Sequence, residues 1–312
     1  MIRVFRSTDI GMQEFTDIEA GSWIALTAPS VEELRTISKR FHIDMDDLKS
    51  PLDDEERSRM EVEDEYTFLI MDLPTTKEKN DREYYDTIPF GIFYVDDVII
   101  TVCLEDSPVL TVFMDGRVRN TSTQNRTRFL YQMLYRNASM YLQYLKVIDR
   151  KSEEIEALLQ EKQRNEELIE MLDLEKSLVY LNTSLRGNEV VLEKLKRNSS
   201  IKRTEDDEEL LEDVIVENKQ AIEMAKIYSD ILNGTMDAYA NIINNNMNSV
   251  MKFLSIITVV LTVPTIITGA IGMNLNGIPF AREAEGFWMM VACIVICTIV
   301  TGIYVGKSKR LK

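Results

Sequence analysis

Two long apolar runs near the C-terminal end of the sequence constrain its fold more than any other feature. Residues 251–271 read MKFLSIITVVLTVPTIITGAI and carry one charge, Lys252, while residues 287–305 read FWMMVACIVICTIVTGIYV and carry none. At about 1.5 Å per helical residue, each run can cross a hydrocarbon core about 30 Å thick. The alternative, a pair of buried core helices, is disfavoured because a short loop joins the runs and a basic tail follows them. The sequence therefore predicts an integral membrane protein with transmembrane helices at 251–271 and 287–305.

The charges that flank the two runs predict their orientation. Lys252 lies at the start of the first run, and the tail, residues 306–312, is basic through Lys307, Lys309, Arg310 and Lys312. The loop at 272–286 carries Arg282 against Glu283 and Glu285. Since cytoplasmic flanks are rich in Lys and Arg, we expect a multi-pass protein of the cell membrane (the inner or plasma membrane), with both termini in the cytoplasm and the loop outside.

Composition excludes several classes of function. Lys plus Arg total 36 against 52 Asp plus Glu, a net charge of -16, so nucleic acid is not an expected partner. Three cysteines and one histidine, His42, make a disulfide framework, a histidine-based zinc site and a Ser-His triad improbable. We find no Gly-rich phosphate loop and no nucleophile motif, and because the first residues contain no apolar stretch we expect no signal peptide. The chain is therefore not expected to be an enzyme.

The part of the chain before the membrane divides in two by pattern. In residues 1–120, short β-rich runs alternate with turn-like stretches such as TTKEKND and with one helical pattern at 31–41, which predicts an α+β domain with a mixed sheet. In residues 121–250, Pro and Gly become scarce and charged helical patterns take over. We expect helices at 124–160, at 165–196 and from 206 onward, the last running unbroken into the membrane for about 65 residues. The expected fold is an α+β cytoplasmic domain with a long helical stalk and two C-terminal transmembrane α-helices.

Polar and small residues recur on one face of that last helix. Steps of three and four residues from Asn248 give Asp230, Gly234, Asp237, Asn241, Asn244, Asn248, Met251, Ser255, Thr258, Thr262, Thr265, Gly269 and Gly272. A stripe with this period indicates a helix face that meets a symmetry-related partner. One interpretation is that the hydroxyls bond their own i−4 carbonyls or pack closely against a neighbour. The other is the face of a pore, which requires an oligomer because two spans per chain cannot enclose one.

The first span ends in Gly272-Met273-Asn274, within the context AIGMNLNGIP. Gly-Met-Asn at the outer end of the first of two C-terminal spans resembles the signature of the CorA-type magnesium transporters. The resemblance covers the whole chain: an acidic α/β domain, long helices, NSVMKFL entering the membrane, a short outer loop, a second span and a basic tail. It implies a homopentamer with a funnel-shaped cytoplasmic part. The first span would line the pore, and residues 272–274 would form its outer entrance and selectivity filter.

The residues of this motif suit Mg²⁺, an ion that gives up its water reluctantly. A ring of Asn274 amide oxygens can accept hydrogen bonds from a hydrated ion without stripping it, and we expect Gly272 to let the chain turn sharply. Co²⁺, Ni²⁺ or Zn²⁺ is the alternative cargo, although candidate ligands that are all oxygen favour a hard ion. An alternative of another class is a membrane-anchored sensor or scaffold, which would need neither the stripe nor the filter.

The resemblance also implies roles for residues of the stripe. Asp237, Asn248, Met251 and Thr265 match pore-facing positions of the family, and Met251 with Leu254 resembles the hydrophobic constriction that closes such pores. Where some relatives have a glutamate shortly after the motif, this chain has Asn276, so Glu283 and Glu285 would attract cations instead. The pore-lining prediction comprises Asp237, Asn241, Asn244, Asn248, Met251, Leu254, Ser255, Thr258, Thr262 and Thr265.

A regulatory Mg²⁺ site between neighbouring subunits is the last implication of the resemblance. In RFHIDMDDLKSP, Asp46 and Asp47 match the family's acidic pair, and in LLEDVIVEN, Asp213 matches an acid of the long helix. Without the resemblance these carboxylates would be interpreted as a helix end and a solvated helix face. Tyr135 stands near the place of a further acid that some relatives have, which puts a second full site in doubt.

Overall fold

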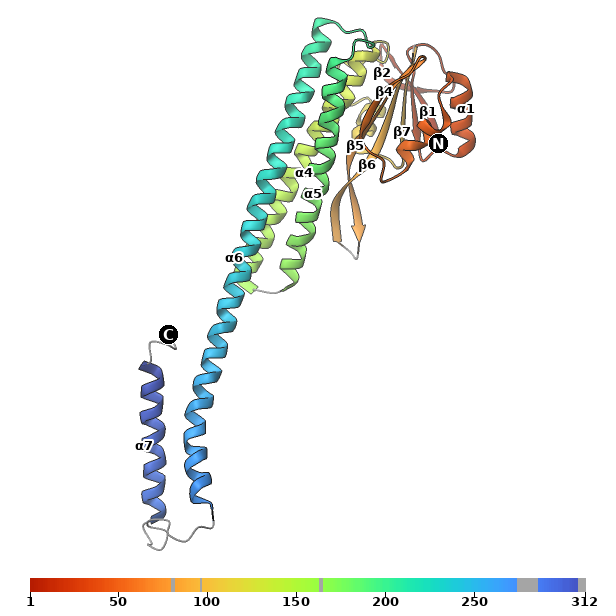
Figure 1. The fold of residues 1–312 in the computed structure, drawn as a ribbon. Coiled ribbons are helices and arrows are strands. Elements are labelled where there is room, and N and C mark those ends of the chain that lie inside the picture. The colour runs from red at the N-terminus through yellow and green to blue at the C-terminus, as the bar shows by residue number, and fades with distance from the viewer. Residues whose placement is uncertain (80–81, 96, 163–164, 274–285, 308–312) are drawn as a thin grey trace. The chain divides into compact units, whose positions relative to one another are not determined.

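The computed structural model describes residues 1–79, 82–95, 97–162, 165–273 and 286–307 (Figure 1). Its contacts divide the chain into two compact units, Met1–Met236 and Asp237–Lys312. Each unit is described below by itself. The domain boundaries proposed from the sequence, at 120/121 and 250/251, stay predictions.

The first unit is built on a seven-stranded sheet with the order β2-β1-β3-β7-β6-β5-β4. β3 and β7 pair in parallel, with Trp23 opposite Ile99, and the other neighbouring pairs among the described strands are antiparallel. The sheet is thus mixed, as predicted. The strands are β1 (Ile2–Thr8), β2 (Gly11–Phe15), β3 (Trp23–Thr27), β4 (Arg59–Val62), β5 (Tyr66–Lys79), β6 (Arg82–Val95) and β7 (Ile99–Cys103).

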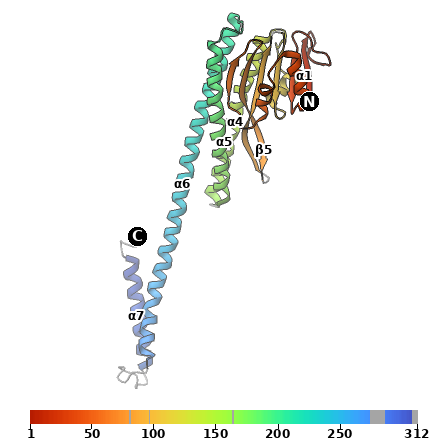
Figure 2. The same ribbon diagram turned by 45° about the vertical axis from the view of Figure 1, so that its right-hand side comes forward.

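Helices cover both faces of this sheet (Figures 1 and 2). Alternation along β3 decides which side chains face which layer, because successive residues of a strand point to opposite faces. Ile24 and Leu26 join a core beneath α1 (Val31–Phe41), α2 (Met45–Lys49) and the short 3-10 helix η1 (Ser50–Leu52). Trp23 and Ala25 join the larger core of the other face. That core is closed by α3 (Pro108–Met114), α4 (Arg126–Lys162), α5 (Asn165–Arg197) and the first turns of α6 (Glu205–Ile271).

The three long helices lie where the sequence predicts them, with ends that differ by a few residues. α6 begins with a reciprocal cap: the Asp207 amide donates to Thr204 Oγ1 at 3.3 Å, and the Thr204 amide donates to Asp207 Oδ2 at 3.0 Å. The acidic first turn of α6 adds a favourable interaction with the helix dipole. The predicted helix at Val31–Phe41 is also confirmed, and a capping box between Ser30 and Glu33 starts it.

Part of the sheet contradicts the sequence analysis. The stretch TTKEKND was predicted as a turn, but β5 continues to Lys79 and pairs with β6 as far as Arg82. This two-stranded ribbon is held by α5, since Ser177 Oγ accepts from the Tyr85 amide at 3.1 Å and Thr87 Oγ1 lies 2.8 Å from Ser184 Oγ. β2, β4 and α3 were not predicted either.

The second unit consists of the rest of α6 and of α7 (Gly286–Lys307). Both contain windows apolar enough to cross a membrane, with mean hydropathies of 2.2 and 2.3, and 0% and 6% of the residues in those windows are buried. Core helices of a soluble protein would be mostly buried, so these helices fit a membrane instead. The helix continues through Pro264 to Ile271. The two predicted spans fall within α6 and α7.

Candidate ion pathway and regulatory acidic residues

The membrane part of α6 has two different faces. Ile256, Val260, Val263 and Ile267 are half-buried and recur at helical spacing, so they form one face of this segment. In Figure 1, α7 runs beside this part of α6. Ser255, Thr258, Thr262 and Thr265 are exposed. At 100° per residue the two sets point roughly 150° apart. The hydroxyl stripe predicted from the sequence therefore lies on the exposed side of α6, which also carries the exposed apolar residues Val259, Leu261 and Ile266.

Each hydroxyl of this stripe donates its proton to the backbone of its own helix. Ser255, Thr258, Thr262 and Thr265 donate to the carbonyls of Met251, Leu254, Thr258 and Leu261 at 2.8, 2.8, 2.7 and 2.8 Å. This is the self-satisfied arrangement that one interpretation of the stripe predicts, and Thr298 and Thr301 of α7 do the same. This arrangement has a consequence for a pore. Because each hydroxyl proton is already donated to a backbone carbonyl, the hydroxyl oxygen can only accept hydrogen bonds from the pore. A row of acceptors suits an ion whose bound waters donate.

Toward the N-terminal side of the membrane segment, the same face carries amides and then apolar side chains. Asn241, Asn244 and Asn248 are exposed, and a hollow on the helix surface is lined by Asn248, Met251 and Ser255 among others. Met251 and Leu254 are 57% and 51% exposed, although both are large and apolar. Apolar side chains exposed on a face that also carries amides are candidates for contact between copies of this helix.

The described chain reaches only part of the predicted filter. α6 ends at Ile271, and the Gly272 amide donates to the Thr268 carbonyl at 2.8 Å. Gly272 does not use the left-handed backbone conformation; instead, an added Cβ would lie 3.2 Å from the Thr268 oxygen. The sharp turn expected at Gly272 therefore does not depend on a left-handed φ angle. Met273 is exposed, whereas Asn274, Asn276, Glu283 and Glu285 lie outside the described residues.

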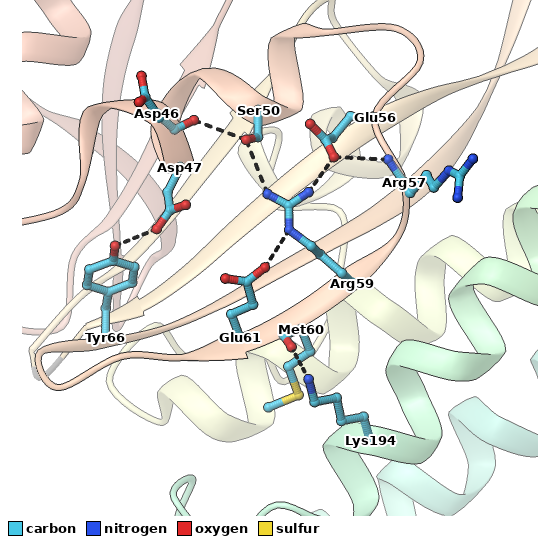
Figure 3. A network of polar contacts seen from close by, with 10 residues as sticks. All are labelled: Asp46, Asp47, Ser50, Glu56, Arg57, Arg59, Met60, Glu61, Tyr66 and Lys194. Atoms are coloured by element: carbon cyan, nitrogen blue, oxygen red, sulfur yellow. Dashed lines mark hydrogen bonds and ion pairs between the residues drawn. The ribbon is translucent and has the colours of Figure 1, made fainter.

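The predicted acidic pair lies on the short helix α2, against the start of β5 (Figure 3). The Asp46 side chain is 94% exposed and its Oδ1 lies 3.5 Å from Lys49 Nζ. Asp47 is half-buried and accepts a hydrogen bond from the Tyr66 hydroxyl at 2.6 Å. The Ser50 hydroxyl donates to the Asp46 carbonyl at 3.0 Å and accepts from Arg59 Nη2 at 3.2 Å. The two neighbouring aspartates therefore differ: one is loosely paired on its own helix and the other is tied to the sheet.

Asp213 lies on an exposed face of α6, one turn before Glu217. Tyr135 of α4 is close to both acids: the charge of Glu217 raises the pKa of Tyr135 most, with burial and the charge of Asp213 adding to it. Among the described residues no group of three or more acids, histidines or cysteines could hold a metal. Asp47 lies on α2, which covers one face of the sheet, and Asp213 lies on α6, whose first turns close the core of the other face.

Sequence reasoning missed Tyr66 and Glu217, which lie beside the predicted acidic residues, and it missed Asp72, which lies elsewhere in the first unit. Tyr66 and Glu217 were missed because their roles depend on contacts between separate elements of the fold. Glu217 could have been found from its i,i+4 spacing to Asp213. Asp72 is a third: burial raises its pKa to about 6, against hydrogen bonds from Ser184 and Ser58. A carboxylate inside the apolar run YTFLIMDL was the signal for it.

Comparison with known proteins identifies the family. Residues 19–310 match the family model described as "CorA-like Mg2+ transporter protein". The chain is 29% identical over 287 residues to the cobalt/magnesium transport protein CorA of Methanocaldococcus jannaschii, which covers 89% of this chain and 87% of that protein. It is 23% identical over 314 residues to the cobalt/magnesium transport protein CorA of Thermotoga maritima, which covers 99% and 89%.

A solved structure extends this similarity to the fold. The complete structure of the CorA magnesium transporter from Methanocaldococcus jannaschii matches with a TM-score of 0.85 at 26% identity, covering 99% of this chain and 98% of that one. The predicted fold class, an α+β part with long helices and two C-terminal membrane helices, is thereby confirmed. Since the family model covers nearly the whole sequence, this chain belongs to the CorA-like Mg²⁺ transporter family.

Proposed function

We propose that this protein is a homopentameric channel that passes Mg²⁺ into the cytoplasm down its electrochemical gradient. The observation that carries the proposal is the exposed row of hydroxyl and amide acceptors on α6. Five copies of this face would line a pore, with Asp237, Asn241, Asn244 and Asn248 on the cytoplasmic side and Ser255 to Thr265 in the membrane. The names of relatives, which include magnesium and cobalt transport, agree with this cargo.

The chemistry of the row favours a hydrated ion. Mg²⁺ keeps its waters unless an octahedron of oxygens replaces them, and neutral acceptors bind those waters without holding the ion too tightly to release it. Asn274 would form the outermost ring, with Gly272 and Met273 shaping its approach. Further along, Met251 and Leu254 would form the constriction that closes the pore by excluding water. The chain would work without catalytic chemistry, as a transporter and not an enzyme.

The membrane orientation is part of the proposal. Both termini would lie in the cytoplasm, since Lys252 and the basic tail flank the spans on one side. Cytoplasmic Mg²⁺ bound between subunits, by Asp47 and Asp213 with Asp46 nearby, would then close the channel. Carboxylates brought together at an interface repel one another, and a divalent ion between them turns that repulsion into attraction.

Flux through purified protein in liposomes tests the cargo and the filter together. Wild-type protein should give saturable Mg²⁺ uptake, and Asn274→Ala should abolish it while pentamers still assemble, because the amide ring that receives the hydrated ion is lost. Asn276→Ala, two residues away in the same loop, is the matched control and should keep most of the uptake. Unchanged uptake and ion preference in Asn274→Ala would remove the basis for the amide ring.

The same assay separates the alternatives. Uptake of Co²⁺, Ni²⁺ or Zn²⁺ in preference to Mg²⁺ would assign a different cargo to the same pathway. No flux of any divalent cation from assembled pentamers, in vesicles with and without internal Mg²⁺, would favour the membrane-anchored sensor or scaffold.

A further inference from the structure

The Tyr66 hydroxyl makes two hydrogen bonds that fix the direction of its proton, and Figure 3 shows the one to Asp47. It accepts from the Asp44 amide at 3.3 Å and lies 2.6 Å from Asp47 Oδ2. An ionised carboxylate can only accept, and a backbone amide can only donate. The one phenolic proton is therefore directed at Asp47, and charge-assisted bonds of this kind are the stronger ones.

Tyr66 is itself held firmly by the sheet. It is the first residue of β5, 7% exposed, and its ring lies 5.9 Å from that of Phe93, which stacks on Phe68 at 4.4 Å. A second anchor fixes the other end of the helix, since Ser50 links the Asp46 carbonyl to Arg59 of β4. α2 has only five residues, too few to be stable as a helix alone, and these anchors together with the buried Leu48 hold it in place.

The two carboxylates of α2 are therefore presented differently. In the described part of the chain Asp47 Oδ1 has no hydrogen-bond or ion-pair partner, while Oδ2 is occupied by the phenol. Asp46 has its carboxylate in water beside Lys49 of the same helix. A carboxylate with one oxygen fixed by a hydrogen bond and the other free is arranged to bind a cation through a single oxygen, which suits the strict octahedron of Mg²⁺.

We propose that Tyr66 is a positioning residue for the regulatory cation, which orients Asp47 so that Oδ1 binds the ion and which makes Asp47, rather than Asp46, the ligand of this pair. The inference rests on the proposed regulatory role of Asp47. Hydrogen-bond partners behind a metal ligand fix its orientation, and their removal costs about 10- to 100-fold in metal affinity. Tyr66 thus couples the sheet to the strength of Mg²⁺ binding.

Tyr66→Phe in the full-length protein, in detergent or liposomes, tests this role. The Mg²⁺ concentration that half-protects the cytoplasmic part against a protease should rise by about 10-fold. The ring stays packed on Phe93, so the unfolding temperature without Mg²⁺ should stay close to that of the wild type. Tyr94→Phe is the matched control: Tyr94 is a half-buried tyrosine of the same sheet whose hydroxyl lies 3.1 Å from Thr127 Oγ1, and its loss should leave the midpoint unchanged.

Asp47→Asn and the double variant distinguish this inference from the proposed function. Asp47→Asn should raise the midpoint, and adding Tyr66→Phe to it should change nothing further, because the phenol acts only through that carboxylate. If Asp47→Asn moves the midpoint and Tyr66→Phe does not, the positioning role is wrong and the regulatory site stands. The positioning role would also be overturned if Tyr66→Phe raised the Mg²⁺ midpoint by the same factor in the wild type and in Asp47→Asn. If neither variant moves the midpoint, the regulatory site and the inference fall together.

Discussion

Asp72 is a carboxyl group placed where the sheet meets α4 and α5, and its surroundings are polar but uncharged. Its carbonyl accepts from Asn137, Tyr141 and Asn188, and Ser58 Oγ lies 3.4 Å from its carboxylate. Because burial disfavours the charged form, the pKa of Asp72 is raised to about 6. In the folded protein this group therefore binds its proton more tightly than in the unfolded chain.

The sign of the resulting pH dependence follows from that shift. The pKa of Asp72 is higher in the folded protein than in the unfolded chain. The protonated Asp72 carboxyl is therefore tolerated at low pH, and the free energy of unfolding falls as pH rises from about 4 to about 6. Asp72→Asn should therefore stabilise the protein at pH 8, by at most about 3 kcal/mol, and change little at pH 4. Thermal unfolding of both proteins across this pH range is the measurement.

A neighbouring acid provides the control for this prediction. Asp86 of β6 forms an ion pair with Lys77 at 2.9 Å, so Asp86→Asn removes a favourable interaction and should give no gain at pH 8. Equal unfolding temperatures for wild type and Asp72→Asn at pH 8 and pH 4 would show that the Asp72 carboxylate is not penalised by burial.

Among the elements, the long helices were predictable and the sheet only in part. α4, α5 and α6 follow from sustained helical spacing in a region with few Pro and Gly residues, which is a local signal. The end of β5 was not predictable from Thr75 to Lys79, because its charged residues imitate a turn and what makes it a strand is pairing with β6. Strand propensity depends on such neighbours more than helix propensity does.

The candidate site divides in the same way. The stripe on α6 has a period, so its exposed hydroxyls could be found from the sequence. The hydrogen bond from Tyr66 to Asp47 could not, since it joins residues 19 apart on a strand and a helix whose packing no local pattern specifies. The sequence pattern alone also could not decide where the hydroxyl protons of the stripe go, which the bond from Thr262 to the Thr258 carbonyl answers for one of them.

The two faces of α6 predict different reactivity for cysteines placed on them. In a background without Cys103, Cys293 and Cys297, a cysteine at Thr258, Thr262 or Thr265 should react with small water-soluble thiol reagents, because water in the pore allows the thiolate to form. A cysteine at Val260 or Ile267, on the half-buried face, should react far more slowly. Labelling rates in liposomes provide the comparison, and equal rates for both sets would make the stripe a packing feature.

At the scale of the whole molecule, the proposed assembly predicts feedback by internal Mg²⁺. An ion can shift a conformational equilibrium only by binding one state more tightly than the other, so closure requires that Mg²⁺ prefer the arrangement in which Asp47 and Asp213 meet. A site of few charged ligands empties near the working concentration, as a sensor must. Uptake would then be greatest when the cell is depleted, when the empty sites let the like charges separate the subunits.

Replacing both Asp47 and Asp213 with Asn removes two opposing effects. One is the repulsion between the empty carboxylates, and the other is the clamp, meaning the attraction of both carboxylates to a bound Mg²⁺. We expect loss of the clamp to dominate, because the neutral pair has no state that Mg²⁺ stabilises; flux should become about 5- to 150-fold less sensitive to Mg²⁺ inside the liposomes. Protease protection by Mg²⁺ should weaken in parallel. Asp115→Asn, an exposed acid paired with Arg117 at 2.8 Å and far in sequence from both, is the control for a general loss of charge. If the double variant kept wild-type inhibition and protection, the sensor would lie elsewhere, and the acidic first turn of α6 from Glu205 to Glu208 would be the next segment to neutralise.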